Sequence, residues 1–277
     1  MAVYEPILLK NIGVEGVRGL DVYRSRGGYG AVAKALKMSP DDVVEEVKKA
    51  NLRGRGGAGF PAGVKWTFLP KDRKRTLLCV NADESEPPTF SNRVLMEGDP
   101  HSLIEGTIIA AYATRSQTAY IYMRVEFHEA FHILQRALDE AYASSLVGRN
   151  ILGSGFDLNI YIHRGAGAYV CGEETGLIES LEGKRGWPRI KPPFPAVEGL
   201  FRQPTVVNNV ETIVNVPHII NRGADWFLGI GPKGSSGPKL FCVSGAVNRP
   251  GCFEAAMDIT CEELVMGDRF GRGMAGG

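Results

Sequence analysis

The chain has 277 residues, of which 44% are hydrophobic and 23% charged, and its formal net charge is +1. This composition supplies enough apolar side chains for a folded core, and the balanced charge argues against a protein that binds nucleic acid. No apolar run approaches the roughly 20 residues of a membrane-spanning helix, and the first residues lack a signal-peptide pattern, so the sequence predicts a cytoplasmic protein without direct membrane insertion.

Glycine and cysteine are the informative minor residues. The chain contains 35 glycines, roughly twice the usual share of about 7%, and they cluster in a few loops without a three-residue period. The cysteine spacing argues against a local zinc or iron–sulfur site and against a secreted disulfide scaffold, because no two cysteines form a C-x-x-C pair. The cysteines are Cys79, Cys171, Cys242, Cys252 and Cys261.

Two helices are expected before the first strand. A short one spans residues 31–36. The second begins with Ser39 as its cap and Pro40 in its first turn, and valines at helical spacing continue it to about residue 50.

The middle of the chain alternates strands with helices. Apolar and β-branched runs predict strands at residues 76–80, 118–125 and 156–162, and periodic apolar residues predict helices at 100–113 and 126–144. This βαβαβ order is typical of a parallel sheet with right-handed crossovers, so ligands are expected at the carboxyl ends of the strands.

After residue 185 the chain becomes rich in proline. Asn208 and Asn209 open a predicted helix that continues to about residue 221. Residues 239–244 are then expected to form the first strand of a new unit, which this chain does not complete. The fold class is therefore expected to be α/β, with a mostly parallel sheet and flanking helices.

The densest glycine cluster occupies residues 53–66, R-G-R-G-G-A-G-F-P-A-G-V-K-W. Its glycines allow the backbone to approach a ligand and to aim several N–H groups at one anion, and Lys65 adds a charge suited to phosphate. The spacing matches neither the dinucleotide fingerprint nor the NTPase phosphate loop, in which a Ser or Thr stands at the place of Trp66. A flexible linker is the alternative, although the aromatic residues in this segment argue against it.

Two further candidate sites follow predicted strands. Residues 81–88, N-A-D-E-S-E-P-P, place three carboxylates where they would accept hydrogen bonds from ribose hydroxyls and repel a 2′-phosphate. Residues 164–177 carry glycines before a predicted helix at 173–181, whose positive end favours Glu173 and Glu174. An acidic surface turn and simple helix-dipole partners are the respective alternatives.

No protein acid, base or nucleophile stands out. The five histidines are scattered and none lies in a recognisable hydrolase order. We therefore expect a bound cofactor to carry the chemistry while the protein positions it. A P-loop-like phosphotransferase is the weaker alternative, because Lys65 lacks a neighbouring hydroxyl and partners for Mg²⁺.

Five motifs in this order resemble the flavoprotein subunit of respiratory complex I, which binds NADH and FMN. They are residues 53–66, N-A-D-E-S-E-P (81–87), G-A-G-A-Y-V-C-G-E-E-T (165–175), K-P-P-F-P (191–195) and N-N-V-E-T (208–212). The resemblance runs from residue 5 to about residue 251 and extends to subunits of NAD-linked formate dehydrogenases and hydrogenases. It implies an N-terminal helical segment with the glycine-rich loop (1–62), a Rossmann-like FMN- and NADH-binding domain (63–235) and an incomplete ubiquitin-like β unit (236–277).

The resemblance also implies a role for each matched position. The FMN phosphate and flavin edge would be held by Gly54, Gly56, Gly57 and Lys65. The flavin or ribityl chain would be bound by Asn81, Asp83, Glu84, Tyr169, Gly172 and Glu173, and the phosphate end would be closed by Asn208, Asn209 and Thr212. NADH would be contacted by Phe60, Phe68, Phe194, Glu86, Glu174 and Lys191, with the carboxylates favouring NADH over NADPH.

The sequence departs from the family in two respects. The family has a glycine and a Lys-Asp pair where this chain has Pro88 and Ser91-Asn92. The family also continues into a helical domain with a [4Fe–4S] cluster on four cysteines. No cysteine here matches that motif, so the cluster's ligands are absent from the sequence and no metal site is expected.

We therefore expect an FMN-dependent NADH dehydrogenase module, cut off after its flavin domain, that transfers a hydride from NADH to FMN. The implied partners are a thioredoxin-like [2Fe–2S] subunit and the iron–sulfur subunit of the peripheral arm, which would hold the protein beside the inner membrane. The alternatives are a shortened nucleotide-binding paralogue without electron transfer, or a diaphorase subunit of a formate dehydrogenase or hydrogenase. The sequence leaves open which complex the chain serves.

Overall fold

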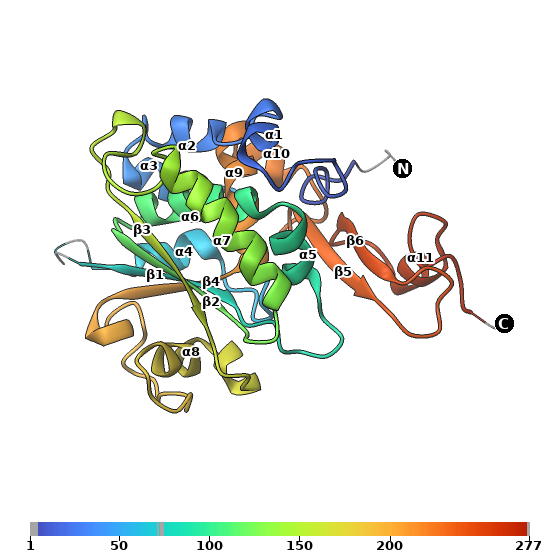
Figure 1. The fold of residues 1–277 in the computed structure, drawn as a ribbon. Coiled ribbons are helices and arrows are strands. Elements are labelled where there is room, and N and C mark those ends of the chain that lie inside the picture. Colours follow the sequence, from blue (N-terminus) through green and yellow to red (C-terminus); the bar gives the residue numbers. More distant parts are fainter. Residues whose placement is uncertain (1–4, 71, 73–74, 276–277) are drawn as a thin grey trace.

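A four-stranded parallel sheet forms the centre of the molecule (Figure 1). The computed structural model describes residues 5–70, 72 and 75–275. The strands run in the order β3-β2-β1-β4. Their bounds are β1 (Leu77–Ala82), β2 (Thr118–Met123), β3 (Asn159–Arg164) and β4 (Thr205–Asn209). Leu77 lies opposite both Thr118 and Thr205, so β1 sits between two parallel neighbours.

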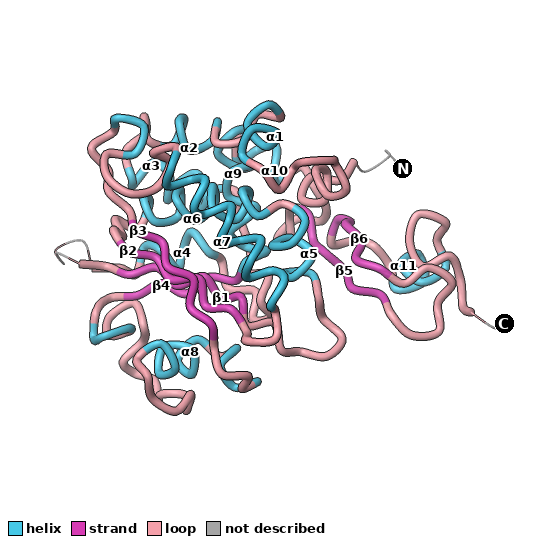
Figure 2. Tube along the Cα trace, viewed as in Figure 1, coloured by secondary structure: helices cyan, strands magenta, loops and turns pink. Residues whose placement is uncertain are grey.

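Helices cover both faces of this sheet, as Figure 2 shows. One face carries α6 (Pro100–Ala113), α7 (His128–Ala143) and α9 (Val210–Arg222), with α5 (Ser91–Gly98) beside them. The opposite face carries α8 (Glu174–Leu181). Because helices lie on both faces, the central strand must be apolar on both, which explains the continuous apolar run at 77–80.

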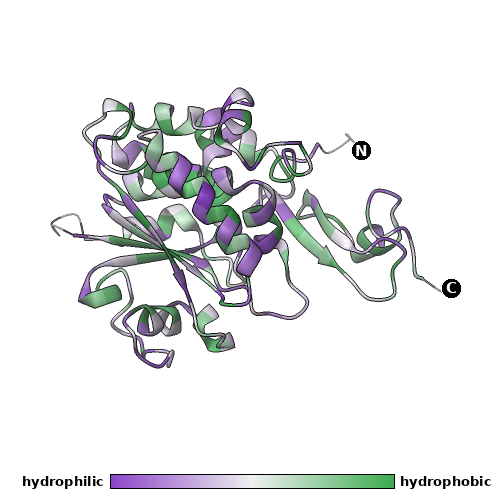
Figure 3. Ribbon diagram, in the orientation of Figure 1, coloured by the Kyte–Doolittle hydropathy of each residue, from purple (hydrophilic) through white to green (hydrophobic). Residues whose placement is uncertain are grey.

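Alternating side chains of β1 divide the core into two. Leu78 and Val80 belong to the large core beneath α6 and α9, whereas Leu77 and Cys79 belong to a smaller core beneath α8. All four side chains are fully buried. Figure 3 shows the consequence, with hydrophobic residues gathered between sheet and helices and hydrophilic ones along α7.

The helices of the large core pack closely, and a glycine permits it. A Cβ atom on Gly106 of α6 would lie 2.3 Å from the carbonyl oxygen of Ile213 in α9. Any larger residue at this position would push the two helices apart. The crossing therefore requires glycine at residue 106.

A buried carboxylate joins the N-terminal helices to α6. These helices are α1 (Leu20–Ser25), α2 (Gly30–Ala35) and α3 (Pro40–Lys49). Glu105 of α6 accepts hydrogen bonds from the Tyr23 hydroxyl at 2.5 Å and from the backbone N–H of Ala31 at 3.0 Å. Beside it, the Tyr29 hydroxyl bonds His101 Nδ1 at 2.8 Å. The first helices thus share one core with the sheet.

The C-terminal part of the chain forms a hairpin that projects from the main body (Figure 1). After α10 (Ala224–Leu228), strands β5 (Pro238–Val243) and β6 (Gly251–Ala256) pair antiparallel, and α11 (Cys261–Met266) follows. Two buried carboxylates attach the hairpin. Glu211 of α9 accepts from Leu240 N at 2.9 Å and Lys239 Nζ at 2.7 Å, and Glu254 of β6 accepts from Ile7 N at 2.8 Å.

The α/β class and the βαβαβ order predicted from the sequence are confirmed. The prediction is wrong at the fourth strand. Asn208 and Asn209 end β4, and the helix expected to start at Asn208 starts at Val210. This strand has only five residues and follows a proline-rich stretch, so pairing with β1 decides its conformation. The short helices α1, α4 (Ala62–Thr67), α5, α10 and α11, and the strand β6, were likewise not predicted.

Within the described ranges, no helix combines the length and the apolar character needed to span a membrane.

Asp99 provides a test of the buried polar network. It precedes α6 and is 3% exposed. Its Oδ2 accepts from Asn11 Nδ2 at 2.8 Å, whereas Oδ1 has no hydrogen-bond partner among the described residues. Burial raises the pKa of Asp99 to about 6, outweighing the hydrogen bond from Asn11.

The stability contributed by Asp99 should therefore rise with acidity. Its folded pKa of about 6 exceeds the unfolded value of about 3.9, so the folded state takes up a proton first as the pH falls. Between about pH 7 and about pH 5, the unfolding free energy of the wild type should rise by about 1 kcal/mol relative to Asp99→Asn, which does not titrate. Urea denaturation measures this difference. The exposed Asp21→Asn variant should track the wild type, and a pH-independent difference for Asp99→Asn would contradict the assignment.

Candidate functional site

The carboxyl ends of β1 and β4 form the floor of the candidate site. The chain leaves β1 towards α5 and α6 on one face of the sheet and reaches β4 from α8 on the other. Connections that diverge in this way open a crevice at the strand ends, where parallel sheets bind ligands. Asn81 of β1 pairs with Asn209 of β4, and Asp83 follows directly. Three predicted residues thus meet at the switch point.

The glycine-rich loop at 53–61 lies against the end of β4. A backbone bridge between Arg53 and Pro61 closes the loop, and Gly54 N donates to Phe60 O at 3.0 Å. A Cβ on Gly56 would lie only 3.0 Å from Cβ of Asn209, so the loop backbone occupies space that a side chain would fill. The loop therefore presents backbone at the switch point.

Two predicted residues support this loop from below. The hydroxyl of Thr212, which is fully buried, accepts from Arg55 N at 2.9 Å. Asn208 Oδ1 accepts from the indole N–H of Trp66 at 2.8 Å, which fixes α4. In this structure both side chains therefore bond protein groups that carry the loop and helix α4.

The acidic segment after β1 contains a residue that supports the neighbouring helix. Glu84 is 7% exposed and accepts from the backbone N–H of Asn92 at 2.9 Å and of Arg93 at 3.0 Å, so it caps α5 from outside the helix. The side chain of Asn92 accepts in turn from Asn209 Nδ2 at 2.7 Å. Ser91 adds a hydroxyl bond to Glu84 at 3.1 Å. The residues that depart from the family pattern are thus built into the site.

Two lysines and two glutamates alternate beside the loop. Lys65 Nζ lies 3.1 Å from Val207 O and 3.9 Å from Glu174, and Lys191 Nζ lies 2.6 Å from Glu174 and 3.2 Å from Glu173. Burial lowers the pKa of Lys65 more than Glu174 raises it. For Lys191, burial is outweighed by the two glutamates, so its pKa is raised. Because Glu174 is already paired with Lys191, Lys65 is the lysine suited to receive an external anion.

Glu173 also caps the N-terminus of α8. Its Oε2 accepts from the backbone N–H of Thr175 at 2.7 Å and of Gly176 at 2.9 Å. These bonds, together with Lys191, outweigh partial burial and lower the pKa of Glu173. The predicted helix-dipole role is therefore present, and one carboxylate oxygen of Glu173 is directed to Lys191.

The turn before α8 closes the site from the other side. Asn81 Nδ2 donates to Gly172 O at 2.8 Å, which joins β1 to the 3₁₀ turn at Tyr169–Gly172. The Tyr169 hydroxyl donates to the Glu86 carboxylate. Partial burial raises the pKa of Asp83 despite a bond from Ser85. Carboxylates and amides suited to hydroxyl groups therefore surround the strand ends.

Exposed aromatic rings accompany these polar groups. The exposed fraction is 43% for Phe60, 54% for Phe68, 58% for Phe194 and 64% for Tyr169. The rings of Phe60 and Phe68 lie 5.9 Å apart and tilted. Large exposed rings are unusual on a soluble surface and suit the stacking of flat ligands.

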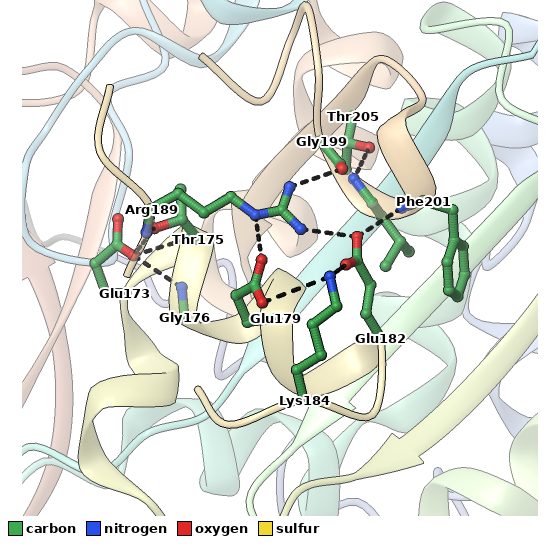
Figure 4. Close-up of polar contacts among 11 residues, drawn as sticks. Glu173, Thr175, Gly176, Glu179, Glu182, Lys184, Arg189, Gly199, Phe201 and Thr205 are labelled. Carbon is green, nitrogen blue, oxygen red and sulfur yellow. Dashed lines mark hydrogen bonds and ion pairs between the residues drawn. The ribbon is translucent and has the colours of Figure 1, made fainter. Parts of the chain in front are cut away.

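A strap, defined as residues 185–202, carries Lys191 and Phe194, and Arg189 of the strap makes several bonds to α8 and the residues beside it (Figure 4). Arg189 donates from Nε to Glu179 at 2.5 Å, from one terminal nitrogen to Glu182 at 2.8 Å and from the other to Gly199 O at 2.9 Å. Its backbone N–H donates to Thr175 Oγ1 at 2.8 Å. Arg189 was not predicted; its position between prolines ahead of K-P-P-F-P was the available signal.

These groups together suit a nucleotide with a flat ring system. The glycine loop and Lys65 suit a phosphate, the carboxylates and amides suit hydroxyl groups, and the exposed rings suit stacking. A cavity of about 140 Å³ lies elsewhere, between α3, α4 and the end of α6, and is lined by residues such as Asp41 and Thr114.

Comparison with known proteins places this chain in a family. The family described as "Nuo51 FMN-binding domain" matches residues 47–218. An NADH-quinone oxidoreductase subunit from Rhizobium meliloti is 56% identical over 265 residues, covering 95% of this chain and 63% of that protein. Its counterpart from Aquifex aeolicus, also named as an NADH-quinone oxidoreductase subunit, is 54% identical over 259 residues, covering 94% and 61%.

A solved structure has a similar fold. An NAD⁺-reducing [NiFe]-hydrogenase in its air-oxidized state superimposes with a TM-score of 0.80 at 40% identity, covering 96% of this chain and 43% of that one. The present chain therefore spans less than two thirds of the length of these curated relatives. With most of the sheet and site inside the matched range, the chain belongs to the Nuo51 FMN-binding domain family.

Proposed function

We propose that this chain is the NADH- and FMN-binding module of an NADH-quinone oxidoreductase. The relatives that carry the name of that enzyme support the proposal. The observation that carries it is the meeting of the glycine loop, Lys65 and the asparagines at the β1–β4 switch point.

FMN fits this arrangement. Its phosphate would be held by the backbone of Gly54, Gly56 and Gly57 and by Lys65, because glycine-rich backbone presents several N–H groups to one anion and a Cβ at Gly56 would crowd Asn209 at 3.0 Å. The flavin and ribityl chain would be bound by Asn81, Asp83, Tyr169, Gly172 and Glu173, and Asn209 would close the phosphate end. Glu84, Asn208 and Thr212 would hold the backbone around the phosphate and flavin. When bound, FMN accepts a hydride from the nicotinamide and releases the electrons singly.

NADH would lie on the exposed rings. Phe60, Phe68 and Phe194 would stack on its adenine or nicotinamide and keep water from the reacting face. Lys191, held by Glu173 and Glu174, would donate to NADH oxygen atoms. Glu86 and Glu174 would accept from ribose hydroxyls and repel the 2′-phosphate of NADPH. No side chain has to act as acid or base, since a hydride moves between the two bound groups.

The wider setting is also part of the proposal. Electrons would pass to iron–sulfur centres of partner subunits, among them a thioredoxin-like [2Fe–2S] subunit and the iron–sulfur subunit of a peripheral arm beside the inner membrane. Residues 63–235 would form the nucleotide-binding domain, after the segment at 1–62. Residues 236–277 would belong to a ubiquitin-like unit, of which the β5–β6 hairpin is the first part.

A diaphorase role is the second candidate. It is favoured by the likeness to the NAD⁺-reducing [NiFe]-hydrogenase. That role uses the same nucleotide site and differs in the partner that supplies or takes the electrons.

Reduction of bound flavin tests the proposed function. Anaerobic addition of NADH to the FMN-reconstituted chain should bleach the visible flavin absorbance, and ferricyanide should restore it. NADPH should act at least about tenfold more slowly, because carboxylates repel its extra phosphate. A protein that binds FMN but shows no bleaching with NADH would overturn the hydride-transfer proposal and favour a paralogue without electron transfer.

The role of Lys65 is testable with two flavins. Lys65→Met should weaken FMN binding at least about tenfold, since a charge-assisted bond to phosphate contributes about 1.5 kcal/mol or more. Riboflavin, which lacks the phosphate, should bind both proteins equally. Flavin fluorescence quenching measures both affinities, and Lys48→Met on the surface of α3 is the control. Equal loss for both flavins would mean a structural defect instead.

The strap gives a test on the NADH side. Arg189→Met should raise the Kd for NADH about tenfold, equivalent to about 1.4 kcal/mol, while the Kd for FMN stays the same, because only the strap carries Lys191 and Phe194. Arg189→Lys should not restore binding, since one ammonium cannot reach three separate acceptors. Arg185→Met, which alters an exposed guanidinium of the strap, is the matched control. Titration measures both affinities, and an unchanged NADH Kd for Arg189→Met would contradict this role.

A further inference from the structure

Two cysteines face each other across the C-terminal hairpin. The antiparallel register pairs Cys242 of β5 directly with Cys252 of β6, and both are free thiols. Directly opposed residues of an antiparallel pair have Cα atoms about 4.5–5.5 Å apart and project to the same side of the sheet. A disulfide requires a Cα separation of about 4.4–6.8 Å, so the backbone already has the spacing that a bond needs.

The surroundings make the two thiols unequal. Cys242 Sγ accepts a hydrogen bond from Phe90 N at 3.3 Å. A bond from the Cys252 thiol outweighs burial and, with Phe90 and Lys239, lowers the pKa of Cys242 to about 7, although Glu84 opposes this. The same bond raises the pKa of Cys252, together with burial and the charges of Glu84 and Glu211. Cys242 is therefore the better nucleophile near neutral pH, and Cys252 is the resolving thiol.

Both thiols are partly exposed, which separates them from the other cysteines of the fold. Cys79 and Cys171 are buried in the core under α8. Cys261 is exposed on α11 and has no cysteine opposite it. A small reagent can therefore reach the opposed pair, while the buried thiols stay protected.

We propose that Cys242 and Cys252 form a reversible dithiol–disulfide pair that reacts with small disulfides such as oxidised glutathione. The Cys242 thiolate attacks one sulfur of the reagent, forming a mixed disulfide and releasing one glutathione thiolate. Cys252 then gives its proton to that thiolate and attacks Cys242 Sγ, which releases the second glutathione. Two protein thiols are oxidised and one reagent disulfide is reduced to two thiols, so atoms and electrons balance.

The pair lies beside the nucleotide site, although the proposal does not depend on the proposed function. Phe90 directly precedes α5, which packs against β5 (Figure 1). Two residues later, Asn92 bonds both Glu84 and Asn209. Oxidation replaces a thiolate by a neutral sulfur as the acceptor for Phe90 N–H. Oxidation therefore weakens the hydrogen bond to Phe90 N–H at the start of α5, the end of the helix that Glu84 holds in place.

Mass spectrometry of the full chain in a Cys261→Ser background tests the proposal. With oxidised glutathione at about pH 7, the peptide containing residues 242 and 252 should lose two hydrogens, and dithiothreitol should restore them. Cys252→Ser should trap a glutathione adduct on Cys242. Cys242→Ser should react at least about tenfold more slowly, since its remaining thiol is largely protonated at this pH.

A second readout follows the structure itself. The backbone amide resonance of Phe90 should shift on oxidation and return on reduction, whereas the amide of Glu262, on exposed α11, should not move. A chain that stays fully reduced, or that only accumulates glutathione adducts with both cysteines present, would overturn the proposal. So would equal reaction rates of the two single variants.

Discussion

The parallel pairing of β4 with β1 is the constraint on which the rest of the structure depends. It brings Asn81 beside Asn209 at the carboxyl ends of the two strands, although the two residues are far apart in sequence. Because β2 and β3 lie on the other side of β1, the chain passes over opposite faces of the sheet before and after this point. The contact of the glycine loop with Asn209 and the placement of Lys65 beside β4 both follow because these two strands end together.

Carboxylates hold the surrounding parts in place. Glu84 fixes the start of α5, Glu173 caps α8, and Glu211 attaches the hairpin to α9. Each accepts backbone N–H groups, which offsets part of the cost of burying a charge. These residues sit at joints between elements, and this arrangement divides the acidic residues into those that support the site and those, such as Glu86, that remain on its surface.

The strap shows how one side chain can position several others. The planar guanidinium of Arg189 reaches Glu179 of α8, Glu182 directly after α8 and the carbonyl of Gly199 at once. This holds Lys191 Nζ 2.6 Å from Glu174. Lys65 then remains as the cation that can face a phosphate, so the division of labour between the two lysines follows from the geometry of the strap.

The α/β class, the alternation of strands and helices, and the glycine-rich and acidic segments could be predicted from the residues alone, because they depend on local periodicity and backbone freedom. The resemblance to a family supplied the individual site residues. Contacts in the fold show that residues 205–209 form a strand, that Thr212 supports the loop while Asn208 fixes α4, and that Ser91 and Asn92 bind Glu84. Such partners come from distant parts of the chain, and their hydrogen bonds leave no periodic signal in the sequence.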